Sequence, residues 1–355
     1  MNFRGELALK FTIQIANQYT VPELVRLAQL AHAEGFKQVW VNDNLCQRNI
    51  FVVLAAMAPR VPIKVGTSML VPYFRNPVDL ADSVAALSEL TEGRELSVGI
   101  ARGDLARAGH QIDMKKPIAM VRETTLAIKA LLAGETISFR DYPASASYHH
   151  IRQQQEFRLA FSPTAPVRFY CGGNGPKILK IAGEIMDGVL IGNYYIPLVR
   201  ARRLDFLLAI ARTAAEATQP GKALFDVCEL DVSISRDRRR ALQFAKPYVA
   251  HIIMVLELMG FTHDEFRTIG IEPQLIKSLK EASAGGATLH AASTLIPDDA
   301  VTGCFVAGGP QECRDQIATL IEEAERLKFG QIAFSKLGPD YDEAIKLLRN
   351  QVLRA

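Results

Sequence analysis

A glycine turn followed by proline is the first feature of this sequence that could do chemistry. It reads GGNG at Gly172–Gly175, and Pro176 comes next. Proline suits the first turn of a helix, where its missing N–H would have had no partner. The unpaired amides and the dipole of a helix N-terminus favour an anion, so we expect this turn to bind a phosphate. A tight strand-to-helix turn without a ligand is the alternative.

The turn matches neither of the two common phosphate-binding motifs. A P-loop needs Gly-Lys-Ser/Thr, whereas Lys177 lies between Pro176 and Ile178. A dinucleotide fingerprint would have a third glycine at Ile178 and an acidic residue at the end of the next strand, where Gly192 and Asn193 stand. A phosphate bound here would therefore be held by a different arrangement of residues.

Two carboxylates, Asp43 and Asp104, are candidate acid–base groups because each follows a predicted strand. They could act as a glycosidase-like pair, although the sequence does not give their distance. His32, His251 and His263 fall on helices or in an insertion, and we interpret them as structural. The sequence has no HExxH, paired CxxC or GxSxG motif, so we predict no metal site and no serine nucleophile. A phosphate turn with few acid–base groups favours a cofactor that does the chemistry.

Alternating strands and helices must position these residues. Alternation of apolar segments predicts eight strands, each followed by a helix, at 10–16, 37–41, 62–67, 95–100, 167–171, 188–191, 225–234 and 331–334. Eight repeats in this length favour a (β/α)8 TIM barrel over a doubly wound sheet. We predict a single domain, 1–355, with two insertions. The first, at about 136–160, is polar and aromatic and is expected to form a hairpin over the site. The second, at about 261–299, is expected to be irregular.

The composition argues against several classes of protein. The chain has 355 residues and a formal net charge of +3, which is too small to indicate nucleic acid or a membrane surface as a partner. Its five cysteines lack metal-ligand spacing, and such an odd, scattered set is typical of a reducing cytosol. No segment is apolar over the ~18 residues of a membrane span, and the start does not resemble a signal peptide. We expect a cytoplasmic protein that acts on a small molecule.

Functional residues of a barrel lie at the carboxyl ends of its strands. The glycine turn ends the fifth predicted strand. The other strand ends carry Gln14, Asn42, Asp43, Asn44, Thr67, Ser68, Met69, Arg102, Gly103, Asp104, Gly192, Asn193, Ser335 and Lys336.

Six motifs occur in the same order as in a known superfamily and extend over nearly the whole chain: VWVND at 39–43, VPYFRNP at 71–77, SELTEGRELSVGIARGD at 88–104, KKP at 115–117, GGNGPKILKIAGEIMDGVLI at 172–191 and LGPD at 337–340. Through these motifs the sequence resembles the luciferase-like superfamily of flavin and deazaflavin oxidoreductases. Within it, the chain is most similar to the methylenetetrahydromethanopterin reductases that use coenzyme F420.

The resemblance implies a homodimeric barrel that transfers hydride between reduced F420 and a small organic substrate. The phosphate would lie at the glycine turn, the ring would lie in the barrel mouth, and a non-prolyl cis peptide would join Ser68 to Met69. The implied cofactor-binding residues are Asp43, Ser68, Met69, Val71, Gly103, Asp104, Cys171, Gly172, Gly173, Asn174, Gly175, Gly192 and Asn193. An FMN-dependent reductase or monooxygenase is one alternative, and a non-catalytic flavin-binding barrel is another.

Two positions depart from the family pattern. Many relatives have Asp-His where this chain has Asp43-Asn44, and the methanopterin reductases have glutamate where this chain has Gln14. An amide cannot exchange a proton near neutral pH as an imidazole does. Asp104 is then the predicted proton donor, unless it caps a helix, and Asp43 is a coenzyme ligand. The predicted catalytic set is Asp104, Asp43, Asn44 and Gln14.

Overall fold

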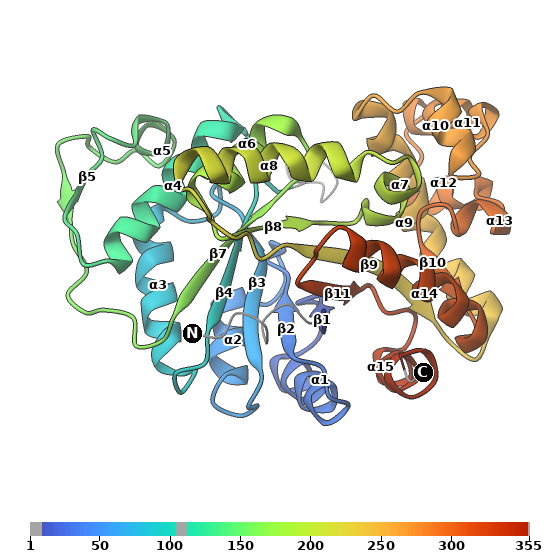
Figure 1. Ribbon diagram of the computed structural model, residues 1–355, viewed down its shortest axis with the longest axis horizontal. Coiled ribbons are helices and arrows are strands. Elements are labelled where there is room, and N and C mark those ends of the chain that lie inside the picture. The colour runs from blue at the N-terminus through green and yellow to red at the C-terminus, as the bar shows by residue number, and fades with distance from the viewer. Residues whose placement is uncertain (1–8, 104–111, 354–355) are drawn as a thin grey trace.

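Eight parallel strands form a closed barrel in this computed structural model, which describes residues 9–103 and 112–353 (Figure 1). Strand β9 pairs with both β8 and β11, and β11 pairs with β1, which closes the ring. The predicted TIM barrel is confirmed. Its strands are β1 (Lys10–Ile15), β2 (Gln38–Val41), β3 (Lys64–Leu70), β4 (Leu96–Ile100), β7 (Val167–Gly172), β8 (Gly188–Ile191), β9 (Val227–Ile234) and β11 (Gln331–Ser335).

The helices that follow the strands surround the barrel, and local signals fix where they begin. In α3, for example, Pro77 is the first residue, and the Asn76 side chain accepts hydrogen bonds from the amides of Val78 and Asp79. The surrounding helices are α1 (Val21–Ala33), α2 (Ile50–Met57), α3 (Pro77–Glu89), α4 (Pro117–Leu132), α6 (Pro176–Ile185), α7 (Tyr195–Arg200), α8 (Leu204–Thr218), α9 (Arg238–Leu258), α14 (Pro310–Arg326) and α15 (Tyr341–Leu347), which runs into a π-helical turn, η3 (Leu348–Val352).

The middle of the barrel is a packed apolar core rather than a pore. Trp40 and Tyr170 meet edge to face there, with ring centroids 5.3 Å apart. Leu190, Val227 and Ala333 complete this inner cluster, and all five residues are buried. The apolar layer separates a polar layer at the carboxyl ends of the strands from another polar layer at their amino ends.

Strand β3 carries a bulge at its carboxyl end. Its register with β4 shifts between Thr67 and Leu70, and the Ser68–Met69 peptide is cis, as the resemblance implies. The Met69 side chain packs against the inner cluster. A Cβ added to Gly172 would come within 2.8 Å of Met69 Cε, and one added to Gly99 within 2.6 Å, so these two glycines make room for the methionine.

The first insertion forms the predicted hairpin. Strands β5 (Ile137–Ser138) and β6 (Glu156–Phe157) pair antiparallel, and α5 (Pro143–Tyr148) lies between them in sequence. The insertion packs beside α4, and Tyr148 meets Tyr73 edge to face at 4.9 Å between centroids.

The second insertion is helical, so the prediction of an irregular segment was wrong. Short helices there have their own start signals, such as the capping box of Thr262 and Glu265. They pack beside α9 (Figure 1). The elements are α10 (His263–Thr268), α11 (Pro273–Ala284), α12 (Leu289–Ala292), η2 (Ser293–Leu295) and α13 (Asp298–Val301), after which β10 (Val306–Gly308), also not predicted, pairs with β9.

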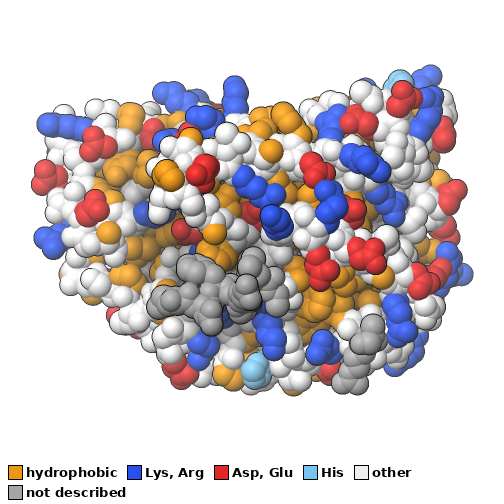
Figure 2. Space-filling view, viewed as in Figure 1, with side chains coloured by type: hydrophobic (Ala, Val, Ile, Leu, Met, Phe, Trp, Pro, Cys, Tyr) orange, Lys and Arg blue, Asp and Glu red, His pale blue; other side chains and the backbone are white. Residues whose placement is uncertain are grey.

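Within the described ranges, α9 is the one helix with the length and composition to cross a membrane. Half of its most apolar stretch is buried, and it packs beside β9 and β10, which is how a core helix of a barrel behaves. Lysine and arginine side chains alternate with acidic ones over the face shown in Figure 2, in keeping with the small net charge.

Candidate active site

Polar side chains from β1, β2 and β3 meet at the carboxyl end of the barrel. Gln14 Nε2 donates a hydrogen bond to Ser68 Oγ at 3.0 Å, and Asn42 Nδ2 donates to the Ser68 carbonyl at 3.0 Å. Gln14 is buried, yet its Oε1 has no hydrogen-bond partner among the described residues. Buried carbonyl oxygens are normally satisfied, so this oxygen is suited to accept a hydrogen bond from a ligand.

Two buried acids, Glu229 and Asp231, face the same interior from β9. They are two residues apart on one strand, so their side chains point to one face. Lys336 Nζ lies 3.7 Å from Glu229 Oε1 and 3.8 Å from Asp231 Oδ1. Ser335 Oγ donates a hydrogen bond to Asp231, and a Cβ added to Gly192 would lie 3.1 Å from Glu229 Oε2.

Burial shifts the protonation of Glu229 toward neutral pH. Burial raises its pKa to about 7, while the nearby ammonium of Lys336 acts in the opposite direction. Lys336 also donates a hydrogen bond to Asn193 Oδ1 at 3.2 Å, which links β11 to the end of β8. A group with this pKa can hold a proton at pH 7 and still release it to a reacting atom.

The glycine turn joins β7 to α6 and leaves the start of that helix without a side-chain cap. Gly175 occupies the N-cap position, and a Cβ added to it would meet no atom within 4 Å. Within the described parts of the chain, the amides of Asn174, Gly175 and Lys177 have no acceptor, and Asn174 Oδ1 has no donor. Such a group of free amides at a helix N-terminus favours an anion.

The other two glycines of the turn are explained by packing within the protein. Gly172 makes room for Met69, and Gly173 has φ +155° and would place a Cβ 2.6 Å from Ile178 Cγ2. Gly175 is therefore the glycine of the turn that faces open space.

Asp43 and Asn44 lie at the end of β2, but their side chains are engaged differently. Asp43 is buried, and both of its oxygens accept hydrogen bonds from Arg75, at 2.6 and 3.1 Å. A carboxylate paired in this way is suited to position the β2 loop rather than to donate a proton. Asn44 is exposed and donates to Gln47 Oε1 on its own loop at 3.4 Å.

Cys171, Val71 and Asp104 were also predicted as site residues. The Cys171 thiol is buried against the Ile178 carbonyl at 3.8 Å, and burial raises its pKa to about 12. Val71 is buried in a small apolar cluster at the end of β3. Asp104, the predicted proton donor, lies outside the described residues, directly after Gly103, which has φ +81°.

The sequence pattern of one protein family, described as luciferase-like monooxygenase, matches residues 7–325. The chain belongs to the luciferase-like monooxygenase family.

Similar proteins with known names cover almost the whole chain. A 5,10-methylenetetrahydromethanopterin reductase of Methanolobus tindarius is 28% identical over 97% of this chain and 100% of its own length. The solved structure of a coenzyme F420-dependent tetrahydromethanopterin reductase of Methanopyrus kandleri superimposes with a TM-score of 0.74 at 23% identity, covering 97% of this chain and 98% of that chain. An F420-dependent secondary alcohol dehydrogenase, solved with an F420–acetone adduct, gives a TM-score of 0.72 at 16% identity, covering 97% and 98%.

In this luciferase-like chain, the acids of β9 are the site residues that were not predicted from the sequence. The sequence of β9, VCELDVSI, did contain a signal, because two acids alternate inside a strand that is otherwise apolar or small. Alternation places them on one face, and in a closed barrel that face points inward. Both acids lie inside β9 rather than after its carboxyl end, where functional residues of a barrel are expected.

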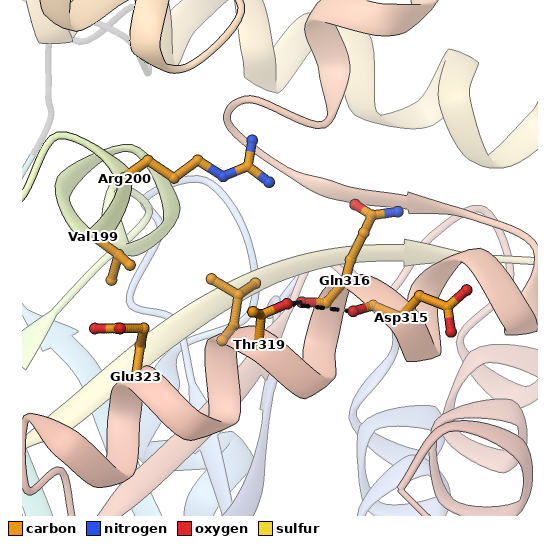
Figure 3. A pocket seen from close by; sticks show the side chains of 7 residues that line it. Val199, Arg200, Asp315, Gln316, Thr319 and Glu323 are labelled. Atoms are coloured by element: carbon orange, nitrogen blue, oxygen red, sulfur yellow. Dashed lines mark hydrogen bonds between the residues drawn. The ribbon is translucent and has the colours of Figure 1, made fainter.

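A cavity of about 420 Å³ lies outside the barrel of this luciferase-like protein, between α7 and α14. Arg200 extends from α7 across the cavity toward Gln316 of α14 (Figure 3). Burial lowers the pKa of Arg200. No carboxyl end of a described strand lines this cavity, so it is separate from the candidate active site.

Proposed function

We propose that this chain is a coenzyme F420-dependent oxidoreductase that transfers hydride between the reduced deazaflavin and a small organic substrate, as a methylenetetrahydromethanopterin reductase does. The relative of that name, 28% identical over 97% of this chain, supports the proposal. The observation that carries it is the uncapped start of α6, where Gly175 faces open space.

The residues present fit such a coenzyme. Its phosphate would be held by the free amides of Asn174, Gly175 and Lys177. Its ring would lie over the Ser68–Met69 bulge, where Gln14 Oε1 can accept a hydrogen bond. We propose that the remaining predicted residues also contact the coenzyme: Asp43, Val71, Gly103, Asp104, Cys171, Gly172, Gly173, Gly192 and Asn193.

The bound coenzyme would supply hydride chemistry, and the chain would supply positioning and a proton. We propose Glu229 as the source of that proton, because it is buried beside Lys336 and burial raises its pKa to about 7. Lys336 lies within 4 Å of both acids of β9 and fixes them relative to Asn193. The apolar cluster around Trp40 and Tyr170 excludes water from below. Glu229 would thus serve as the general acid in a chain that has Gln14 and Asn44 instead of a carboxyl group and an imidazole.

Substitution of Gly175 tests this assignment without disturbing the fold. Asp and Ser both favour the N-cap position, and the space around Gly175 Cβ is open, so we expect both variants to fold. Gly175→Asp places a negative charge where the phosphate would lie, and we expect it to weaken F420 binding at least tenfold. Gly175→Ser, the matched uncharged control, should stay within about threefold of the original affinity. Calorimetric titration with F420 and with FMN measures both effects.

Each outcome of the titration has a clear meaning. Tighter binding of F420 than of FMN supports the proposal, and the reverse order favours an FMN-dependent reductase or monooxygenase. Binding of neither favours a non-catalytic barrel. Unchanged F420 affinity in Gly175→Asp would show that the phosphate does not bind at this turn.

We propose a homodimer in the cytoplasm, built from a single domain, 1–355, with insertions at 136–160 and 261–299. Light scattering coupled to gel filtration should give twice the chain mass of 39.1 kDa. A monomer mass at micromolar concentration would contradict the dimer.

A further inference from the structure

A second cavity, of about 510 Å³, opens at the amino ends of the barrel strands. It lies at the opposite end of the barrel from Gln14 and Glu229, below the apolar cluster of Trp40 and Tyr170. Its lining includes six charged residues and one amide: Lys10, Lys37, Gln38, Lys64, Glu95, Arg168 and Arg349. Its volume is in the range that small-molecule sites occupy.

The charge of this cavity is strongly positive. Its lining has five basic side chains and one acidic one, Glu95. Glu95 is shared by Lys64 at 3.2 Å and Arg168 at 2.9 Å, so it neutralises only part of that pair. The other three basic residues, Lys10, Lys37 and Arg349, have no ion-pair partner within residues 9–103 and 112–353.

A buried amide in the same cavity also lacks a partner. Gln38 is 1% exposed, and neither its Nε2 nor its Oε1 has a hydrogen-bond partner in the described chain. Its side chain points into the barrel, because a Cβ added to Gly66 would come within 2.9 Å of Gln38 Nε2. A buried amide without partners in a cavity is suited to bind a ligand that both accepts and donates hydrogen bonds.

We propose that this cavity binds a small molecule that carries a phosphate group. The ammonium groups of Lys10 and Lys37 and the guanidinium of Arg349 supply the charge that a phosphate requires. Gln38 would bind a polar group of the same molecule deeper in the barrel. The site is independent of the proposed oxidoreductase activity, because the apolar cluster separates the two ends of the barrel.

Calorimetric titration of the full chain with 5′-AMP, inorganic pyrophosphate and adenosine tests the proposal. The titrations are repeated with F420 in excess and in Gly175→Asp, so that a phosphate bound at α6 is not counted. We expect AMP or pyrophosphate to bind and adenosine not to bind. Tighter binding of AMP indicates an organic phosphate, and equal or tighter binding of pyrophosphate indicates that the phosphate alone is recognised. Failure of both overturns the proposal, as does binding that F420 abolishes.

Charge reversal locates the site. We expect the double variant Lys37→Glu/Arg349→Glu to weaken binding at least tenfold. The matched control, Arg140→Glu/Arg152→Glu, makes the same charge change on exposed residues of the first insertion and should change binding less than twofold. Equal losses in both double variants would show a general effect of charge and overturn the site.

A neutral variant tests the site in case the charge-reversal variant does not fold. Gln38→Leu keeps the cavity wall and removes the buried donor and acceptor. We expect it to weaken AMP binding while its thermal unfolding without ligand is unchanged or shifted upward. Unchanged AMP affinity in this variant, together with unchanged affinity in Lys37→Glu/Arg349→Glu, would exclude this cavity.

Discussion

The two acids of β9 have different surroundings although they lie two residues apart. Both lie within 4 Å of the Lys336 ammonium, but Asp231 accepts a hydrogen bond from Ser335, whereas Glu229 faces Gly192. Burial raises the pKa of Glu229 to about 7, so this group can change its protonation during a reaction at neutral pH. Glu229 is therefore the residue at which the proposed chemistry can be tested.

Glu229→Gln should slow substrate reduction about 10²-fold or more at pH 6, the range expected for loss of a general acid. In the original chain, the rate of oxidation of reduced F420 by methylenetetrahydromethanopterin should fall as pH rises through about 7, because Glu229 loses its proton there. In Glu229→Gln, the rate should not fall at this pH. A step that persists at the same pH in Glu229→Gln would assign the proton to another group, such as Asp104.

The sequence could place single residues near strand ends, but not their partners. The positions of Gln14, Ser68 and the glycine turn near strand ends could be predicted, because Gln14 lies in an apolar segment that predicts a strand and the other two directly follow such segments. The pairing of Asp43 with Arg75 could not, since it depends on the path of the chain after β3. The link from Lys336 to Asn193 joins residues 143 positions apart and needs the closed barrel.

Among the elements, β3 carries a bulge that directs Met69 into the inner cluster. Met69 lies against Gly99 and Gly172, and both glycines leave space for it. Several short helices and one short strand were not predicted from the sequence. Helices of four to six residues, such as α10, α12 and α13, span too few turns to produce a helical period, and the three residues of β10 are too few to show alternation.

A double-mutant cycle tests the packing of the bulge. Gly172→Ala should destabilise the protein by about 1–3 kcal/mol, because its Cβ would come within 2.8 Å of Met69 Cε. The same change in a Met69→Ala background should cost much less, since the methionine is gone. Gly175→Ser is the control, with a change of a few tenths of a kcal/mol, because serine is accepted at the N-cap and a Cβ here meets no atom within 4 Å. Urea denaturation of the original chain, the two single variants, the double variant and the Gly175 control measures these changes. Additive changes would show that Met69 is not the obstacle.

For the whole molecule, closure of the barrel brings β8, β9 and β11 together around the buried acids. A closed barrel leaves Glu229 little access to water, and that burial is why its pKa rises above its ordinary value of 4.5. The eight repeats in the sequence predicted the closure itself. They could not predict how burial changes the stability of the folded chain with pH, because that depends on which side chains become enclosed.

The burial of Glu229 should make the folded protein less stable as pH rises from about 4.5 to about 7. In this window the folded chain keeps the proton on Glu229, whereas the unfolded chain loses it, so the folded state binds more protons. The free energy of unfolding then falls with pH, by up to roughly 1 kcal/mol per pH unit from this group. Glu229→Gln lacks the titration, so the difference in unfolding free energy between the original chain and the variant should decrease from pH 5 through pH 7 and level off at about pH 8. Urea denaturation of both cofactor-free proteins at pH 5, 6, 7 and 8 measures this difference, and a constant value across the whole range would mean that Glu229 is charged in the folded protein.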